Sequence, residues 1–199
     1  MRRLGRSFYC QEPVKLAKAL LGKLMVHESP EGLTSGVVVE TEAYLGRGDR
    51  ASHGYMGKRT KRNEVLYLGC GLAYVYVAHG HALFNVTAAP PGEPTAVLIR
   101  ALEPRDGIEL MAKRRGLKLG SERSLRLLCS GPGRLTKAMG ITKEHNGLDL
   151  TKGPVYFTDI GLHPRRVASA PRIGVDYAGE DALKPLRFYV EGSPYVSRK

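Results

Sequence analysis

The sequence of 199 residues predicts an α+β fold, in which a single domain over residues 1–199 holds a curved, mostly antiparallel β-sheet with surrounding helices and a protruding β-hairpin. Three observations predict this class. Short segments rich in β-branched and apolar residues recur along the chain and are typical of strands. These segments do not alternate regularly with helical ones, which disfavours a parallel doubly wound sheet. The length suits one domain, and neither an internal repeat nor a low-complexity linker divides the chain.

Apolar periodicity and turn residues place the elements in order. Residues 13–23 repeat apolar positions at helical spacing, with Pro13 at the entry and Gly22 near the exit. A polar, basic loop, long enough to carry function, is expected from Gly46 to Asn63. The short connection over residues 78–82 contains a glycine and predicts a β-hairpin. The expected strands are residues 24–27, 36–42, 72–78, 83–88, 96–102, 155–158, 167–175 and 186–190, and the remaining helices are residues 106–115, 121–128 and 133–139, with Asp106 and Ser121 as N-caps.

Basic charge is the most informative bulk property. The chain has 31 Lys and Arg against 19 Asp and Glu, which gives a formal net charge of +12. The basic residues cluster in residues 47–62, where Asp49 is the one acid, and in residues 113–126, where Glu122 is the one acid. A compact domain this basic usually binds a polyanion, although the same charge can also simply keep a surface solvated. Composition does not separate DNA from RNA.

Targeting signals and cysteine usage bear on the compartment. The chain has no apolar segment long enough to span a membrane, and no apolar stretch of a signal peptide follows its basic start. We therefore expect a cytoplasmic protein with no membrane partner. Cys10, Cys70 and Cys129 are far apart and odd in number. This pattern argues against a disulfide framework or a zinc site, so we expect three reduced thiols.

One strand carries the first candidates for chemistry. Glu40 and Glu42 point to the same face of the expected strand, and Tyr44 is next along that face. If the face lines a cleft, one of the carboxylates can serve as a general base. If the face meets solvent, the same residues belong to an ordinary edge strand.

Imidazole and phenol side chains form the next group of candidates. His53 lies in the basic loop, where a lone histidine is often inert. Tyr74 and Tyr76 share a face of the first hairpin strand, which fits either the core or the stacking of bases. His79 and His81 at the hairpin tip could begin a metal site, but no third ligand is apparent in the sequence, so we expect no metal.

An arginine and a glycine-rich segment could both meet an anion. Arg100 lies in an apolar strand, where it needs an anionic partner, either a carboxylate or a phosphate. In residues 129–135, Cys-Ser-Gly-Pro-Gly-Arg-Leu, the glycines and the following helix could present backbone N–H groups to a phosphate. The same glycines could also merely end one helix and begin the next.

Six segments, in one order and covering almost the whole chain, resemble a known family. They are Val-Val-Glu-Thr-Glu-Ala-Tyr-Leu-Gly at 38–46, Ala-Ser-His at 51–53, Tyr-Val-Tyr-Val at 74–77, Val-Leu-Ile-Arg-Ala-Leu-Glu-Pro at 97–104, Cys-Ser-Gly-Pro-Gly-Arg-Leu at 129–135 and Pro-Leu-Arg-Phe-Tyr-Val-Glu-Gly-Ser-Pro-Tyr-Val-Ser at 185–197. The first and fourth segments are the most specific. The chain resembles the alkyladenine DNA glycosylase family, also called 3-methyladenine or methylpurine DNA glycosylases.

The resemblance implies a role for each matching residue. Glu42 would activate the water that attacks the sugar C1′, and Asn85 would exclude the exocyclic amine of normal guanine. Arg100 would lie near the general base and a backbone phosphate. His79 at the hairpin tip would fill the gap left in the DNA stack. The walls of the base pocket would be Tyr44, Ala51, His53 and Tyr76, and the further DNA contacts would be Arg59, Thr60, Arg62, Gly131 and Arg134.

The implied substrate is double-stranded DNA containing damaged purines such as 3-methyladenine and 7-methylguanine, with hypoxanthine and ethenoadenine as further candidates. The implied enzyme is a monomer that needs no metal or organic cofactor and leaves an abasic site in an uncut strand. Two features differ from the family pattern. His79 stands where a tyrosine is usual, and the segment from there to Asn85 is one residue shorter. Because a shift of one residue turns a strand side chain to the other face, Asn85 could lie inside or outside the pocket.

Two other functional classes stay open at this point. A non-catalytic nucleic-acid-binding module could use the same basic surface, and Glu42→Ala would then leave all of its activity intact. An enzyme directed at RNA would prefer single-stranded or structured RNA to duplex DNA in a competition assay.

Overall fold

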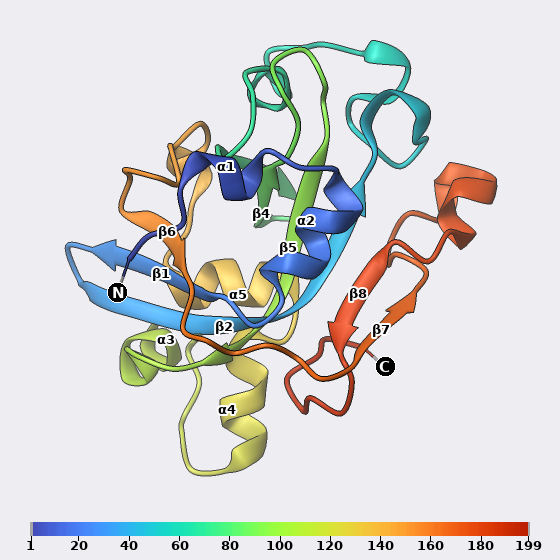
Figure 1. Cartoon of the computed structure of the whole chain (residues 1–199). Coiled ribbons are helices and arrows are strands. Elements are labelled where there is room, and N and C mark those ends of the chain that lie inside the picture. The colour runs from blue at the N-terminus through green and yellow to red at the C-terminus, as the bar shows by residue number, and fades with distance from the viewer. Residues whose placement is uncertain (1, 199) are drawn as a thin grey trace.

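One antiparallel sheet organises residues 2–198, the part of the chain that the computed structural model describes (Figure 1). The strands are β1 (Leu24–Ser29), β2 (Gly32–Tyr44), β3 (Ala73–Ala78), β4 (His81–Thr87), β5 (Ala96–Pro104), β6 (Val155–Thr158), β7 (Val167–Ala170) and β8 (Arg187–Val190). The helices are α1 (Arg6–Tyr9), α2 (Pro13–Leu20), α3 (Ile108–Arg115), α4 (Glu122–Cys129) and α5 (Pro132–Met139), with 3₁₀ turns η1 (Gly46–Gly48), η2 (Tyr55–Gly57), η3 (Glu64–Tyr67), η4 (Lys143–His145) and η5 (Asp176–Leu183). The strand order is β3-β4-β5-β2-β1-β6, with β8 beside β2 and β7 beside β8. The α+β class with a curved antiparallel sheet is confirmed.

The long strand β2 changes partners along its length, and the sheet bends there. Residues Gly32–Val37 pair with β1, whereas Glu40–Glu42 pair with β8, and β5 follows the opposite edge of β2. The register between β2 and β5 slips twice near Glu40, which makes Val39 an extra residue on β2 and Arg100 an extra residue on β5. Bulges of this kind bend a strand and increase its twist. The bend therefore falls where the candidate acidic and basic residues lie.

The two faces of β3, β4 and β5 have different surroundings. One face packs into the main hydrophobic core, which also receives side chains from α2 and α5. Figure 1 shows α2 lying across β2 and β5. The core-facing residues are Val75, Phe84, Val97 and Ile99, all fully buried. Because side chains alternate along a strand, the intervening residues point to the opposite face, which is free to line a cavity.

Helix α2 begins and ends for identifiable reasons. The Glu12 carboxylate accepts hydrogen bonds from the backbone N–H groups of Val14 and Lys15 at 3.2 and 3.1 Å, and proline takes the first helical position. The helix ends at Leu20, short of the expected residue 23. Gly22 has a φ of +84°, and a Cβ there would lie 2.4 Å from the carbonyl oxygen of Leu162. Only glycine fits this close approach, which turns the chain into β1.

The hairpin of β3 and β4 is present with a tighter turn than the sequence predicts. His79 and Gly80 are its two central residues, and both have positive φ, as a type I′ turn requires. Strand β4 therefore begins at His81 rather than at residue 83. Insertion of this hairpin into DNA remains a prediction.

Two further boundaries differ from the sequence analysis. Ser121 caps α4 as expected, but the N-cap of α3 is Gly107 and not Asp106. The Asp106 carboxylate accepts a hydrogen bond from the Ser35 hydroxyl instead. The strand expected over residues 167–175 ends at Ala170, because the next residue is a proline and cannot donate to the ladder.

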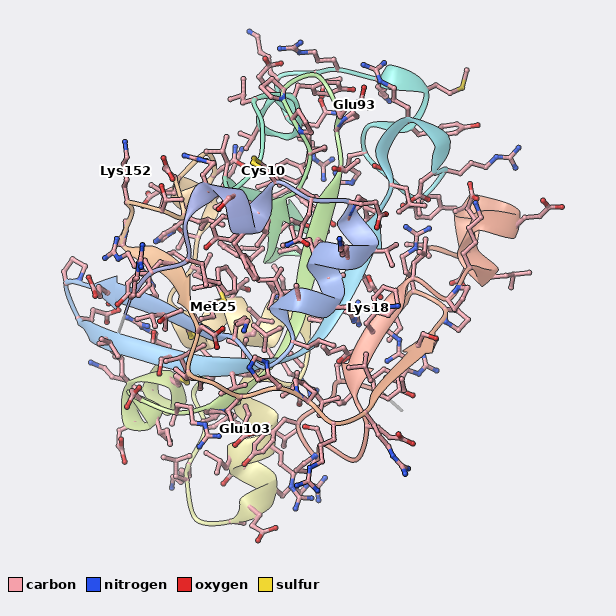
Figure 2. All side chains as sticks on the ribbon, in the orientation of Figure 1. Cys10, Lys18, Met25, Glu93, Glu103 and Lys152 are labelled. Atoms are coloured by element: carbon pink, nitrogen blue, oxygen red, sulfur yellow. A yellow bond between two sulfur atoms is a disulfide. The ribbon has the colours of Figure 1, made fainter. Side chains whose placement is uncertain are left out.

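The expectation of three reduced thiols is wrong for two of them. Cys10 and Cys70 form a disulfide, with their Cα atoms 5.2 Å apart, whereas Cys129 is free and buried as expected (Figure 2). The Arg6 guanidinium also donates a 2.6 Å hydrogen bond to the carbonyl of Cys70. The N-terminal segment thus folds back onto the segment before β3, a proximity that the spacing of cysteines in the sequence does not reveal.

Candidate active site

The face of the sheet opposite the core carries a cavity of about 360 Å³. Beneath it runs a row of residues paired across four strands. Tyr74 is opposite Asn85, Asn85 is opposite Leu98, and Leu98 is opposite Glu42. Paired residues of antiparallel strands share a face, so register alone brings these side chains together. The residues that line the cavity are Tyr44, Ala51, Ser52, His53, Arg62, Leu66, Tyr74, Tyr76, Ala78, His79, Leu83, Asn85, Pro94, Ala96, Leu98, Arg100, Pro132, Ile173, Gly174, Val175 and Tyr177.

An aromatic wall forms one side of the cavity. The rings of His53 and Tyr76 have centroids 4.5 Å apart, and those of Tyr74 and Tyr76 are 5.4 Å apart. His53 Nδ1 is 2.7 Å from the Tyr74 hydroxyl, which fixes the orientation of the imidazole. Burial lowers the pKa of His53 below its ordinary value, and the nearby cations Arg62 and Lys58 lower it further. His53 is therefore uncharged at neutral pH.

A buried ion pair holds the basic loop against the sheet. The Arg172 guanidinium donates two hydrogen bonds to the Asp49 carboxylate, at 2.5 and 2.8 Å, and both side chains are almost fully buried. Asp49 also accepts hydrogen bonds from the backbone N–H groups of Leu45 and Ala51, each at 3.0 Å. Farther along the loop, the Asn63 side-chain amide donates to the carbonyl of His53 at 2.8 Å. These contacts place Ala51 and His53 at the cavity.

The two glutamates of β2 differ in what they contact, although both are completely buried. Glu40 is surrounded by donors, with Arg100 at 3.1 Å, Arg187 at 3.0 Å and the backbone N–H of Ser197 at 2.7 Å. Glu42 shares the Arg100 guanidinium, at 3.1 Å, and accepts hydrogen bonds from the Tyr44 hydroxyl and from a backbone N–H. The anionic partners of Arg100 in the structure are two carboxylates, and its contact with a phosphate remains a prediction.

Glu42 lies directly beneath the cavity, behind lining residues. Its hydrogen-bond donors, Tyr44 at 2.9 Å, Arg100, and the backbone N–H of Ile173 at 2.8 Å, all line the cavity themselves. Burial raises the pKa of Glu42 above its ordinary value, while the charge of Arg100 and the two hydrogen bonds oppose that rise. A carboxylate with a raised pKa is a stronger base than an exposed one as long as it is ionised.

Most residues named from the sequence meet at this cavity. Tyr44, Ala51, His53, Arg62, Tyr76, His79, Asn85 and Arg100 all line it, so the shorter hairpin still directs Asn85 inward. Gly131 and Arg134 line a second, adjacent cavity, and Thr60 lines a third with Arg62. Arg59 lines none of the three and bonds the Glu64 carboxylate, with its Nε 3.0 Å away. The roles of all these residues remain predictions.

The hairpin histidines do not converge on one point. His79 lines the main cavity, whereas His81 lines the second one. Residues 2–198 contain no group of three or more His, Cys, Asp or Glu side chains placed to hold a metal ion. The same residues contain no helix long and apolar enough to cross a membrane.

Several residues that shape the site were not predicted from the sequence. Asp49 was visible as the single acid of a basic loop, which is the signal that a carboxylate there needs a specific partner. Its partner Arg172 and the lining residues Ile173 and Tyr177 come from residues 171–183, a region assigned there partly to a strand. Nothing in their spacing links them to the loop, because the contact depends on the pairing of β8 with β2 and on the bonds from Arg172 and Ile173 to Asp49 and Glu42.

Comparison with known proteins identifies the family. The sequence profile of the family described as "Methylpurine-DNA glycosylase (MPG)" matches residues 7–194. A Bacillus licheniformis relative is 48% identical over 195 residues, which cover 98% of this chain and 96% of the relative. A Bacillus subtilis relative is 47% identical over 192 residues, covering 96% and 95%, and a Desulfitobacterium hafniense relative is 46% identical over the full length of both chains. All three are provisionally named 3-methyladenine DNA glycosylases. The chain belongs to the methylpurine-DNA glycosylase family and is a DNA glycosylase that acts in the repair of alkylated bases.

Proposed function

We propose that this protein flips a damaged purine nucleotide of duplex DNA into the main cavity and hydrolyses its N-glycosidic bond with a water activated by Glu42. The observation that carries the proposal is a buried carboxylate with a raised pKa beneath an aromatic-walled cavity. In this proposal residues 1–199 form a single DNA glycosylase domain that acts as a monomer on chromosomal DNA inside the cell, without a cofactor. The proposed lesions are 3-methyladenine and 7-methylguanine, with hypoxanthine and ethenoadenine as further substrates.

The cavity wall suits a cationic base. Alkylation at N3 or N7 gives a purine a positive charge, which aromatic faces attract. Tyr44 and Tyr76 offer such faces, and a neutral His53 adds a third without repelling the cation. A normal purine is neutral, so it gains less from this wall and is also the poorer leaving group.

Asn85 is held in a fixed orientation that supports a role in excluding guanine. Its side-chain amide donates to the carbonyl of Tyr74 at 3.1 Å, so the nitrogen of that amide is turned toward the β3 backbone. The side chain is 3% exposed and lines the cavity. Because the amide nitrogen is already engaged and the side chain is fixed, Asn85 occupies space at the bottom of the cavity that the exocyclic amine of guanine would need.

Glu42 retains one acceptor position for water. A carboxylate offers about four lone-pair sites, and Arg100, Ile173 and Tyr44 occupy three of those of Glu42. In the proposed reaction the water oxygen bonds to C1′, its proton passes to Glu42, and the base leaves with the electrons of the broken bond. No lysine of the described residues lines the cavity to form a Schiff base, and simple hydrolysis leaves the strand uncut.

The surroundings of the cavity suit duplex DNA. The hairpin turn holds His79 at the cavity edge, where a side chain could occupy the space vacated by a flipped nucleotide. Arg62 lines both the main cavity and the third one, which is also bordered by Arg50, Lys58 and Thr60. Together with Arg59, these residues offer the loop as a surface for phosphates. Flipping costs a few kcal/mol, and such contacts and the inserted side chain offset it.

The test is release of bases from methylated duplex DNA, measured by chromatography. We expect Glu42→Gln to abolish release and to leave binding of lesion DNA almost unchanged, because shape is kept and the proton acceptor is lost. In the wild type, release should decline as the pH falls through the raised pKa of Glu42, since only the ionised carboxylate can accept the proton.

Glu40→Gln is the matched control, because Glu40 is equally buried but two of its donors, Arg187 and the backbone N–H of Ser197, lie outside the lining of the main cavity. We expect it to lower stability first and activity only through stability. Normal turnover by Glu42→Gln would refute the mechanism. Failure of the wild type to release any base would favour a binding module, and preference for RNA in a competition assay would favour an RNA-directed enzyme.

A further inference from the structure

Two exposed turns of the chain share one unusual backbone geometry. Among residues 2–198, Met56 and His79 are the two residues other than glycine with a positive φ, of 53° and 49°. Each is followed by a glycine, Gly57 or Gly80, whose φ is 76°. The turn over residues 55–58 is closed by a 3.1 Å hydrogen bond between the backbone groups of its first and last residues. It is therefore a type I′ turn like the one at the hairpin tip.

The backbone conformation of Met56 is unfavourable for its residue type. Its φ of 53° and ψ of 23° lie in the left-handed region, where the Cβ of an L-residue crowds the following carbonyl oxygen. Glycine and asparagine tolerate this region, whereas a bulky residue there is rare. A strained conformation that is kept at an exposed position is typical of a functional site.

Met56 is also the most exposed large hydrophobic side chain among residues 2–198, at 80%. The next two are Leu183, at 74%, and Tyr177, at 72%. Both belong to η5, which joins the same loop through a 2.9 Å hydrogen bond from the backbone N–H of Arg50 to the Asp181 carboxylate. The apolar exposure is thus concentrated on two neighbouring segments, which indicates a surface that meets a partner.

The loop holds this turn in place without using the methionine side chain. The carbonyl of Lys58 accepts hydrogen bonds from the Asn63 amide at 2.8 Å and from the Tyr67 hydroxyl at 2.7 Å. A Cβ on Gly57 would lie 2.5 Å from Nη1 of Arg47, so glycine lets that arginine pack against the turn. A side chain presented by a backbone that is already fixed loses less entropy on binding.

The turn lies beside the third cavity, of about 420 Å³, because its first and last residues, Tyr55 and Lys58, line that cavity. The third cavity shares four lining residues with the main one: Ser52, His53, Arg62 and Tyr177. No described residue that lines the third cavity is acidic, whereas Arg50, Lys58 and Arg62 are basic. These surroundings favour DNA over an apolar protein surface as the partner of the exposed methionine.

We propose that Met56 is a second inserting side chain, which enters the duplex beside the flipped nucleotide on the side of the basic loop and separates two stacked bases. The proposal rests on the proposed function, because the nucleotide in the main cavity is what seats the duplex over this loop. Methionine is among the apolar side chains that proteins insert between base steps. Unstacking has a cost, and burial of a side chain that is exposed in the free protein offsets it.

The first test compares the affinity for one lesion in a duplex and in a single strand. We expect Met56→Asn to weaken duplex binding about tenfold and single-strand binding hardly at all, since a single strand has no stacked pair to open. The slope of affinity against salt should stay the same, because an uncharged side chain releases no counterions. Met56→Leu keeps an apolar side chain of similar size and should retain the duplex affinity.

Thermal unfolding separates this role from a structural one. Asparagine tolerates the left-handed region, so Met56→Asn should keep or raise the melting temperature while it weakens binding. A melting temperature that falls together with the affinity would contradict the proposal. Leu33→Ala is the matched control, because Leu33 is also an exposed apolar residue but lies at the opposite end of β2 from Tyr44. It should leave duplex affinity unchanged.

The fluorescence of 2-aminopurine locates the insertion, because this base fluoresces more strongly when it loses its stacking neighbours. It is placed in turn at each position beside the lesion, in either strand. A 2′-fluoro group on the lesion nucleotide withdraws electrons from C1′ and slows cleavage, so that binding is observed without turnover. The wild type should raise the fluorescence at one position where His79→Ala still raises it and Met56→Asn does not.

If no position behaves in this way, or if Met56→Asn binds the duplex like Leu33→Ala, the second insertion is overturned. Base release from methylated DNA by the wild type would leave the proposed function standing in that case. Conversely, these measurements do not depend on cleavage, so a wild type that inserts Met56 but releases no base would refute the proposed function alone.

Discussion

Asp49→Asn removes the charge that holds the loop forming one wall of the main cavity. The Asp49 and Arg172 side chains are 1% and 0% exposed, and two hydrogen bonds join them. The substitution keeps the size of the side chain but leaves one oxygen where there were two. It also places an NH₂ group against one guanidinium nitrogen of Arg172 and one backbone N–H, that of Ala51 or of Leu45, which both donate to the carboxylate in the wild type.

The magnitude follows from what remains around Arg172. Breaking a buried ion pair by removing one partner costs about 3–5 kcal/mol, because the other charge stays buried. Arg172 keeps hydrogen bonds to the carbonyls of Ala43 and Asp181, at 3.0 and 3.1 Å, and lies 4.8 Å from the centre of the Tyr44 ring. We therefore expect the free energy of unfolding to fall by about 3 kcal/mol, the lower end of this range, and the melting temperature to fall by about 6–12 °C for a chain of this size.

Urea unfolding measures the free energy of unfolding of Asp49→Asn and of the wild type, with Glu64→Gln as the control. That variant breaks the exposed pair of Glu64 with Arg59, which solvent screens, so little or no loss of stability is expected. Base release should also fall, because the backbone N–H of Ala51 or of Leu45 loses its acceptor and the loop that carries His53 is held less firmly. If Asp49→Asn loses no more stability than the control, the ion pair does not anchor the loop.

Three other outcomes are expected. His79→Ala should slow excision from well-paired duplex strongly but hardly affect a lesion in a mismatch or a single strand, where flipping costs little, and equal losses on both would exclude insertion of the hairpin tip. Burial lowers the pKa of His27, whose Nδ1 is bonded to the carbonyl of Met139 and whose Nε2 is 3.2 Å from Nε2 of His145. The contribution of the neutral His27 to the free energy of unfolding should be full above about pH 6.5 and should be lost as the pH falls through the lowered pKa of the folded state. A urea midpoint as high at pH 5 as at pH 7.5 would contradict this. Reduction of the disulfide that links Cys10 to Cys70 across 60 residues, or Cys70→Ser, should destabilise the protein by about 4 kcal/mol by the loop-entropy relation, and an unchanged melting temperature in reductant would contradict this.

The local sequence pattern predicted the strands and helices better than it predicted the register between neighbouring strands. The strand containing Glu40 and Glu42 and the strand containing Arg100 are both present, because their runs of β-branched and apolar residues fit a pleated, buried surface. The two bulges that bend these strands were not predicted. A bulge is a property of the register between two strands, and neither strand carries that information alone.

The candidate site was predictable to the same extent. Residues within one strand, such as Tyr74 and Tyr76, could be assigned a common face from alternation. The partner of Arg100 was left open between a carboxylate and a phosphate, because the answer depends on which strand lies beside it. The Asp49–Arg172 pair and the disulfide join distant segments, and spacing in the sequence cannot reveal them.

Four charged side chains beneath the cavity, those of Glu40, Glu42, Arg100 and Arg187, explain how the Glu42 carboxylate can be both buried and useful as a base. Burial alone would favour the protonated, unreactive form of Glu42, and it does raise the pKa of that group. The charge of Arg100 opposes the rise, but only if the guanidinium stays beside the carboxylate. Glu40 holds it there, and Glu40 in turn is bonded by Arg187, so that two carboxylates and two guanidiniums balance in charge. Under the proposed reaction Glu40 thus never meets substrate, and its own negative charge raises the pKa of Glu42 further, so its part is to stabilise the cluster in which Arg100 stays beside Glu42.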